Sequence, residues 1–164
     1  MTRPGALVIR LDPMPDADSS GRMASTDRLV LRLLRAEDAV PLQEIVEDGW
    51  IEALAAERGD RALTPWAVVM KDSEEVVVGF CGFFARPLKG TTMGYAIVPK
   101  YRGRGLATEA AAATLEWAER HHVDVYASVR PPNPASVRVL EKIGMRLVDT
   151  YRDEDGQRDI YRRC

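Results

Sequence analysis

The chain has 164 residues, of which 46% are hydrophobic and 29% are charged, with 12 Gly and 10 Pro. This length fits one domain and leaves too few residues for two independent cores, and the composition excludes disordered, collagen-like and low-complexity classes. With 23 Lys and Arg against 25 Asp and Glu, the net charge of −2 provides no general attraction to nucleic acid or to an anionic membrane. Any binding of a charged ligand therefore depends on a local concentration of charge.

The cysteine and apolar content favours a cytoplasmic protein. The two cysteines, Cys81 and Cys164, form neither a disulfide framework nor a metal-ligand cluster, so we expect a reducing compartment and no bound metal. No run approaches the roughly 18 apolar residues of a membrane span, and the apolar run at residues 6–9 is too short for a signal peptide. We therefore expect neither secretion nor a membrane partner.

The start of the chain has the composition of a poorly packed segment. Residues 12–25 are mostly Asp, Pro, Ser, Gly and Met, which gives few apolar positions for packing. We predict a flexible leader over residues 1–24 and a single domain over residues 25–164. The alternative is that residues 7–11 add a strand to the edge of a sheet.

From residue 28 onward, the hydrophobic pattern predicts strands alternating with helices. The predicted strands cover residues 28–34, 66–70, 76–85, 91–98, 123–129, 146–151 and 158–162. The predicted helices cover residues 38–48 and 50–57, a long segment that begins at Leu106, and a last segment that begins at Pro134 and stops before Gly144. Hairpins and one β-α-β crossover occur together in this order, so the expected fold class is α+β.

The segment between the strand at 91–98 and the long helix has the features of an anion-binding loop. Gly103 and Gly105 lack a Cβ, which lets backbone N–H groups approach an anion closely, and the start of a helix adds about half a positive charge. Cations also gather here, with no carboxylate before Glu109. They are Lys100, Arg102 and Arg104. The loop therefore suits a diphosphate, although glycine-rich turns with solvated arginines also occur without a ligand.

The spacing of this loop separates it from two other phosphate-binding motifs. It is not a P-loop, because no Gly-Lys-[Ser/Thr] follows the glycines. It is not a dinucleotide-binding fingerprint, because Thr108 stands where the third glycine would be. The pattern that remains is Arg-x-x-Gly-x-Ala over residues 102–107.

Three segments together resemble the GNAT N-acetyltransferase superfamily. Residues 94–110, GYAIVPKYRGRGLATEA, are similar to its acetyl-CoA motif, whose loop reads [Gln/Arg]-x-x-Gly-x-[Gly/Ala], and residues 133–145, NPASVRVLEKIGM, match a second motif. The opening TDRLVLR at 26–32 is similar to the RimJ/RimL-type branch, which acetylates ribosomal-protein N-termini among other amines. The likeness spans about residues 25–163. It implies a GNAT-like mixed, mostly antiparallel twisted sheet with a splayed parallel strand pair and flanking helices, and an acetyl-CoA-dependent N-acetyltransferase.

The resemblance also implies which residues contact acetyl-CoA. The strand before the loop would hold the pantetheine arm through main-chain groups, the loop N–H groups would take the pyrophosphate, and the helix after Asn133 would contact the arm from the other side. The implied set is Tyr95, Ala96, Ile97, Val98, Arg102, Gly103, Arg104, Gly105, Leu106, Ala107, Thr108, Asn133, Ser136 and Arg138. We place Ser136 near the thiol or the arm and Arg138 near a phosphate. Asn133 fits a plain helix cap equally well, and the strand residues also fit a plain core strand.

The general base and acid are not where relatives place them. A Glu often precedes the Gly-Tyr pair of the acetyl-CoA motif, but Thr92 and Met93 stand there in this chain. Other relatives have Glu at the position of Ser128, and many superfamily members carry a Tyr general acid at the position of Leu140. The general base is therefore unknown from the sequence.

Two weaker sources of catalysis remain. Ser136 is positioned to donate a hydrogen bond to the departing sulfur, and a carboxylate of the C-terminal hairpin would draw the ammonium proton through water. The carboxylates are those of Asp153, Glu154 and Asp155, whose plain interpretation is a solvated turn. Holding both reactants in line supplies much of the rate without either group.

Acidic residues gather in the two short helices, which the resemblance places beside the acceptor. Between residues 37 and 60 they oppose only Arg58. They are Glu37, Asp38, Glu44, Glu47, Asp48, Glu52, Glu57 and Asp60. Our hypothesis is that they attract a cationic amine acceptor such as a basic peptide or a protein N-terminus, whereas each one alone fits a solvated helix face.

Two other classes of function compete with an enzyme. A non-catalytic acetyl-CoA-binding or regulatory module of the same fold is kept open by the missing Glu and Tyr. An RNA-binding module is disfavoured, because no basic stripe with interleaved aromatic residues lies outside the loop. The sequence leaves open whether the protein is a monomer or a homodimer and which amine it acetylates.

Overall fold

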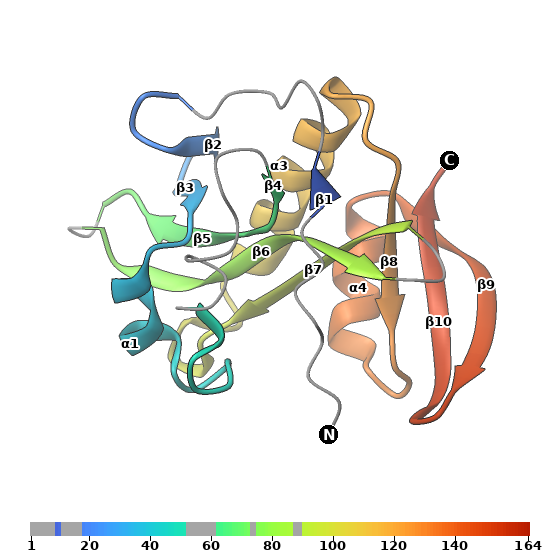
Figure 1. Cartoon of the computed structure of the whole chain (residues 1–164). Helices are drawn as coiled ribbons and strands as arrows, with labels where there is room; N and C mark the ends of the chain where they lie inside the picture. Colours follow the sequence, from blue (N-terminus) through green and yellow to red (C-terminus); the bar gives the residue numbers. More distant parts are fainter. Residues whose placement is uncertain (1–8, 11–17, 52–61, 73–74, 87–89) are drawn as a thin grey trace.

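The fold is built on a twisted sheet in which one parallel strand pair interrupts antiparallel neighbours. A computed structural model describes residues 9–10, 18–51, 62–72, 75–86 and 90–164. The sheet has eight strands in the order β2-β3-β5-β6-β7-β8-β10-β9, and only β7 and β8 are parallel (Figure 1). The predicted α+β class and the mixed, mostly antiparallel sheet are confirmed.

The predicted strands from residue 28 onward are present, and β1, β2 and β4 are additional. The strands of the sheet are β2 (Arg22–Ser25), β3 (Leu29–Leu33), β5 (Pro65–Met70), β6 (Val77–Arg86), β7 (Gly90–Ile97), β8 (Val125–Val129), β9 (Met145–Asp153) and β10 (Gly156–Arg163). A separate two-stranded sheet pairs β1 (Ile9–Arg10) with β4 (Ala62–Leu63). The helical segments are η1 (Ala36–Asp38), α1 (Ala39–Leu42), η2 (Pro99–Tyr101), α3 (Leu106–Arg120) and α4 (Pro134–Lys142). Within these ranges, no helix has the length and apolar character needed to cross a membrane.

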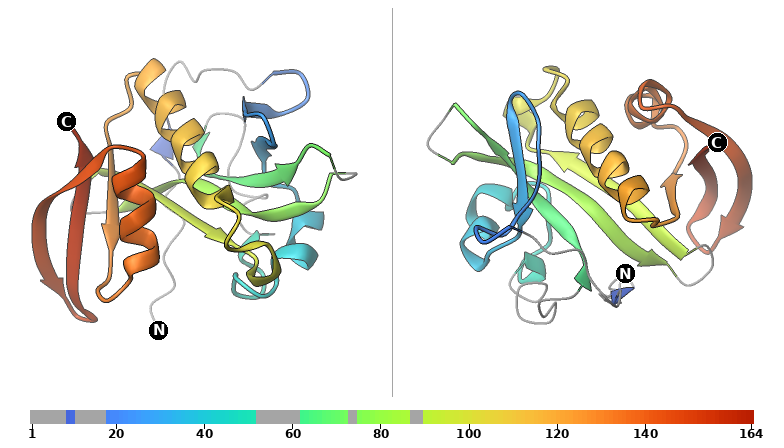
Figure 2. Two further views of the ribbon diagram at one scale, coloured as in Figure 1. Left: turned by 180° about the vertical axis from the view of Figure 1, so that it is seen from behind. Right: turned by 90° about the horizontal axis from the view of Figure 1, so that it is seen from above.

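Helices cover both faces of the sheet. Figure 2 shows α3 and α4 on one face and α1 on the other. The larger apolar cluster lies under α3, where the rings of Trp66, Phe83 and Trp117 meet at centroid distances of 5.1–5.7 Å. A smaller cluster lies under α1 and includes Leu42 and Ile51. Burial of such large apolar side chains contributes on the order of 1.5–3 kcal/mol each, so the helix positions are held mainly by these contacts.

The parallel pair separates partway along its length. The ladder joins Thr91 to Val125, Thr92 to Tyr126 and Met93 to Ala127. Beyond Met93, β7 continues to Ile97 but pairs, within the described residues, only with β6, while β8 continues to Val129 paired with β10 along its other edge. The edge of β7 that faces β8 is therefore open over residues 94–97, which is the splayed pair that the family resemblance implies.

The sheet extends into part of the segment predicted as a leader. Strand β2 begins at Arg22 and pairs with β3, so the sheet starts inside the predicted leader of residues 1–24. Only Met23 and Ala24 of this four-residue edge strand are half-buried, and so short an apolar run carries little pattern. Residues 9–10 do form a strand, but it pairs with β4 and not with the edge of the main sheet. The rest of the leader lies outside the described residues.

The first predicted helix is shorter than its hydrophobic pattern suggests. Instead of running over 38–48, the helix ends at Leu42, whose carbonyl accepts hydrogen bonds from the N–H groups of Ile45 (2.9 Å) and Val46 (3.2 Å). The apolar positions are nevertheless right, because all three side chains belong to the cluster under α1. A turn can bury the same apolar side chains as a helix, so the hydrophobic periodicity predicted a helix that is too long. Of the predicted helix at 50–57, residues 52–57 lie outside the described part.

Candidate functional site

A cavity of about 590 Å³ opens where β7 and β8 separate. It is bounded by the end of β7, the loop that follows, the start of α3 and the exposed side of α4. Its lining residues are Tyr95, Ala96, Ile97, Tyr101, Arg102, Gly103, Gly105, Leu106, Ala107, Thr108, Asn133, Ala135, Ser136, Arg138, Val139 and Lys142. A cavity of this size accommodates a ligand as large as the arm of a coenzyme.

The cavity brings together the predicted cofactor residues, with two exceptions. Val98 is buried in the cluster under α1 and its N–H donates to the Val78 carbonyl, so it belongs to the core. Arg104 does not line the cavity either. Tyr101 and Lys142 also line the cavity, although neither was predicted to contact the cofactor. Lys142 lies two turns beyond Asn133 on α4, and its helical spacing from Arg138 was the signal available for it.

The backbone N–H groups at the mouth of the cavity are free to bind an anion. Gly103 and Gly105 have φ values of +77° and +74°, a left-handed conformation that favours glycine. Gly105 is the N-cap of α3 and offers no side chain to the helix, and the first hydrogen bond runs from Glu109 N–H to its carbonyl at 3.1 Å. Among the described residues, no group accepts from the N–H groups of residues 103–108. These N–H groups and the helix dipole form an anion site.

The cations of the loop are partly held by the protein itself. The Arg102 Nε donates to the Ile97 carbonyl at 2.8 Å, which fixes the loop to the end of β7. The Lys100 Nζ and the Arg104 Cζ lie over the Tyr101 ring, 5.1 and 5.7 Å from its centroid. The loop is therefore positively charged, and these contacts hold it in position.

Arg28, just before β3, joins the sheet to the loop. Its Nε and Nη2 contact Glu109 Oε2 at 2.7 and 2.6 Å, and its Nη1 donates to the Arg104 carbonyl at 3.0 Å. The Thr26 hydroxyl donates to the same carboxylate. Burial acts to raise the pKa of Glu109, but the hydrogen bonds from Thr26 and Arg28 outweigh it and lower the pKa below its usual value. Thr26 and Arg28 belong to the opening motif, which the sequence analysis used only as a family signature.

Helix α4 provides the side of the cavity opposite to β7. The Asn133 side chain accepts a hydrogen bond from Ser136 N–H at 3.1 Å, so its role as a helix cap is confirmed, and it lines the cavity as well. The Tyr95 hydroxyl donates to the Ser136 carbonyl at 3.1 Å and so joins β7 to α4. Burial raises the pKa of Tyr95 to about 12, which keeps the phenol protonated at neutral pH.

The acidic hairpin turn is unsuited to act as a base. Asp153 pairs with Arg158 and, at 3.4 Å, with Arg130, and the hydrogen bond from Arg158 is the main cause of its lowered pKa. The Asp155 carboxylate also lies 3.5 Å from Arg130. None of the carboxylates at 153–155 lines the cavity. Because Arg130 lies just before the Asn133 segment, the turn instead ties the β9–β10 hairpin to the start of α4.

Among the described residues that line this cavity, none carries a carboxylate or an imidazole. Leu140, at the position where many relatives carry the general acid, is 1% exposed in the core. Ser128 has a buried hydroxyl with no hydrogen-bond partner among the described residues, and Thr92 is 6% exposed. The charged side chains among the described lining residues are cations, namely Arg102, Arg138 and Lys142.

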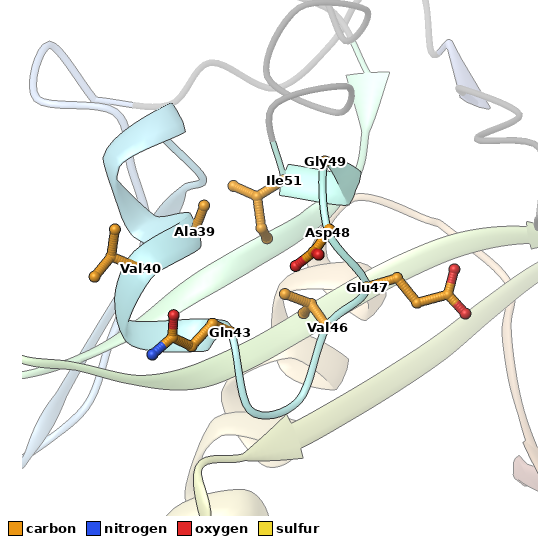
Figure 3. Close-up of a pocket in the computed structure, with 8 residues that line it drawn as sticks. All are labelled: Ala39, Val40, Gln43, Val46, Glu47, Asp48, Gly49 and Ile51. Atoms are coloured by element: carbon orange, nitrogen blue, oxygen red, sulfur yellow. The ribbon is translucent and has the colours of Figure 1, made fainter.

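A second, smaller hollow of about 190 Å³ lies beside α1 on the other face of the sheet. It is lined by Ala39, Val40, Gln43, Val46, Glu47, Asp48, Gly49 and Ile51, drawn in Figure 3. Glu47 and Asp48 are exposed, whereas Asp38 is 2% exposed and forms a two-bond ion pair with Arg32 at 2.8 and 2.9 Å. Asp38 is therefore not one of the carboxylates available to an acceptor, which corrects the prediction for that residue.

The chain belongs to the acetyltransferase (GNAT) domain family, whose profile matches residues 28–146. Acetyl-CoA is the acetyl donor general to this family. The chain is 35% identical over 92 residues to the uncharacterized N-acetyltransferase YnaD of Bacillus subtilis, an overlap of 54% of this chain and 53% of that protein. The chain spans about half the length of the curated relatives it matches.

Solved structures of acetyltransferases have the same fold. A GNAT-family acetyltransferase from Bacillus anthracis aligns with a TM-score of 0.70 at 22% identity, covering 84% of this chain and 95% of that one. Mycobacterium smegmatis RimJ in complex with CoA-disulfide aligns with a TM-score of 0.63 at 22% identity, covering 81% and 80%. At these identities the likeness concerns the fold alone.

Proposed function

We propose that this chain transfers an acetyl group from acetyl-CoA directly to a primary amine. The observation that carries the proposal is the set of unpaired N–H groups at residues 103–108 at the mouth of a cavity between parted strands. The diphosphate binds these N–H groups, with Arg138 and Lys142 adding positive charge from α4. The pantetheine arm then lies along residues 95–97 toward Gly94, which places the acetyl group at the deep end of the cavity.

The proposed acetyl transfer proceeds without a general base from the described lining of the cavity. The amine nitrogen attacks the thioester carbonyl carbon, a C–N bond forms, the C–S bond breaks, and the ammonium proton passes to water while the thiolate takes a proton from its surroundings. Among the described residues, no carboxylate or imidazole lines the cofactor cavity, so the acceptor gives up its ammonium proton to water before its nitrogen attacks. An α-amine with a pKa of about 7.7–8.0 meets this requirement far better than a lysine amine at about 10.4. The Ser136 hydroxyl, on the same lining, serves to hydrogen-bond the departing sulfur.

A protein or peptide N-terminus in the cytoplasm is the acceptor that this chemistry favours. The RimJ/RimL-like opening at residues 26–32 supports the same class, and the RimJ structure above supports it at the level of fold. The exposed carboxylates of Glu47 and Asp48 on the α1 face suit a cationic acceptor. Charge reversal of both residues to Lys is expected to raise the acceptor KM more at low salt than at high salt.

Release of free thiol on mixing acetyl-CoA with peptides tests the proposal. We expect release with at least one peptide N-terminus, a mass increase of one acetyl group on the peptide, and kcat/KM that rises with pH through the α-amine pKa. Acetyl-CoA that raises the melting temperature without any thiol release above hydrolysis would instead support the non-catalytic binding module. The all-cationic lining of the cavity is the observation that favours that second function.

A further inference from the structure

Three aromatic rings form a patch on the sheet face opposite to α3. Phe80 and Phe84 alternate along β6 with Cys81 and Phe83, which are buried under α3, so strand geometry places Phe80 and Phe84 on the other face. Ring centroids of Trp50 lie 5.3 Å from Phe80 and 6.0 Å from Phe84, and those of Phe80 and Phe84 lie 6.2 Å apart. All three are half-buried. Their rings meet one another and leave part of each surface accessible.

This aromatic patch adjoins the point where β7 and β8 separate. Gly94 is the first residue of β7 beyond the ladder to β8, and a Cβ on Gly94 would lie 2.9 Å from Phe84 Cε2. The Phe84 ring therefore covers Gly94, one residue before Tyr95 of the cavity. A cofactor whose diphosphate binds residues 103–108, at the far end of β7, presents its acetyl group toward Gly94. The patch is thus an apolar surface next to Gly94, on the face that the proposed cofactor leaves free.

Charge determines the side from which an ammonium group approaches. The cofactor cavity contains Arg102, Arg138 and Lys142 and no carboxylate. Glu47 and Asp48 are exposed and stand three and two residues before Trp50 in the chain, on the same side of the sheet as the patch. A positively charged amine is therefore attracted to the patch side and repelled from the cavity side. Apolar rings bordered by carboxylates complement an amine that carries a large apolar group.

We propose that the acceptor is an α-amine whose own side chain is aromatic or large and apolar, and that Trp50, Phe80 and Phe84 recognise that side chain. This inference rests on the proposed acetyl transfer and specifies its substrate class. The rings contact the first side chain of the acceptor, because the α-amine must reach the acetyl group beside Gly94 and the side chain is one carbon away. Small or acidic first residues leave the patch uncovered and are poor acceptors.

Peptides that differ only in their first residue, Phe or Ala, provide the test. Both peptides are assayed at a pH above the pKa of their α-amines, so that the ratio of kcat/KM reports side-chain recognition and not a difference in protonation. We expect a preference for the Phe peptide of roughly tenfold or more, and its reduction to about twofold in Phe84→Leu and Trp50→Leu, with an unchanged Kd for acetyl-CoA. Leu147→Ala, which truncates a 55% exposed apolar side chain on edge strand β9, is the matched control and keeps the preference.

Binding measurements separate this inference from the proposed function. Binding of phenylalaninamide and alaninamide to the CoA-loaded protein is measured alongside thiol release. Equal kcat/KM for the two peptides, or a preference that survives both ring substitutions, overturns the aromatic recognition and leaves acetyl transfer standing. Phenylalaninamide binding that depends on Phe84, with no thiol release from any peptide, upholds the patch as an amine site and overturns the transfer.

Discussion

The two faces of β7 differ in how they recognise a ligand. On the side of the cavity, the groups available to the proposed cofactor are the backbone N–H groups of residues 103–108 and the cations that line the cavity. On the opposite side, the available groups are side chains, namely the aromatic patch of Trp50, Phe80 and Phe84 with the carboxylates of Glu47 and Asp48. A backbone site tolerates few replacements, because its geometry depends on glycine, whereas a side-chain surface changes with every substitution. In the proposed function, the backbone of the fold therefore determines binding of the acetyl donor, whereas the side chains particular to this sequence determine which amine is acetylated.

The strongest challenge to the cofactor side is Gly105→Glu. A side chain in the left-handed backbone at φ +74° and a negative charge among the free N–H groups should weaken acetyl-CoA binding by roughly 100-fold or more. Gly21→Glu is the matched control, because Gly21 has a φ of +78° and open space around it, outside the cavity. Isothermal titration of both variants checks this. Normal binding in Gly105→Glu would show that the loop does not hold the diphosphate.

The next largest effect is expected at Arg28. Without its guanidinium, the Glu109 carboxylate is left unpaired in the first turn of α3 and repels the diphosphate, so Arg28→Gln should raise the Kd for acetyl-CoA about tenfold. The double variant Arg28→Gln/Glu109→Gln removes both charges and should recover most of the affinity. If the double variant binds no better than the single one, the contact of Arg28 with the Arg104 carbonyl matters more than its charge.

A smaller effect is expected where the two sides of the cavity are joined. Tyr95→Phe removes the hydrogen bond to the Ser136 carbonyl, worth about 1 kcal/mol, and should raise the KM for acetyl-CoA up to about fivefold. Because the pKa of Tyr95 is about 12, the phenol stays protonated through the assay range and the pH profile of kcat/KM should not move. A shift of the alkaline limb between pH 6 and 9 would instead identify Tyr95 as the group that protonates the thiolate.

The smallest effect is expected at the acidic turn. Asp153 is engaged by Arg158 and Arg130, and its lowered pKa keeps it charged and weakly basic at neutral pH. Asp153→Asn should therefore lower stability slightly and leave the pH dependence of kcat/KM unchanged. Glu154→Gln, in the same exposed turn, serves as the control for charge alone. Loss of the acidic limb of the profile in Asp153→Asn alone would restore Asp153 as a base.

The sequence allowed much of the cofactor side to be predicted because its signals are local. The glycines at 103 and 105 and the Asn133 cap lie within a few residues of the groups they organise, so their spacing is visible in one stretch of chain. Strand β2 was missed because a short edge strand with two half-buried residues has almost no alternation. The helix at 38–48 was overextended because a turn after Leu42 keeps the same apolar contacts.

The other features depended on contacts between residues far apart in sequence. Arg28 reaches Glu109 across 81 positions, and nothing in either segment indicates the other. The aromatic patch combines Trp50 with two residues of β6, and only the alternation of β6 hinted that Phe80 and Phe84 share a face. The arginine partners of Asp153 could not be found from the sequence, because Arg158 lies on β10 and Arg130 follows the end of β8.

The buried Arg32–Asp38 pair has a consequence for how new specificities arise. Two hydrogen bonds between these side chains fix the position of the segment that follows β3, and Asp38 also accepts a hydrogen bond from Arg35 N–H at 2.7 Å. A rebuilt stretch after Asp38 has to keep this ion pair and also the apolar side chains of the cluster under α1, Leu42 and Ile51 among them. Grafting residues 39–51 from a relative that keeps both should change the preferred amine, because position 50 changes, and should leave coenzyme A binding at the proposed site unaltered.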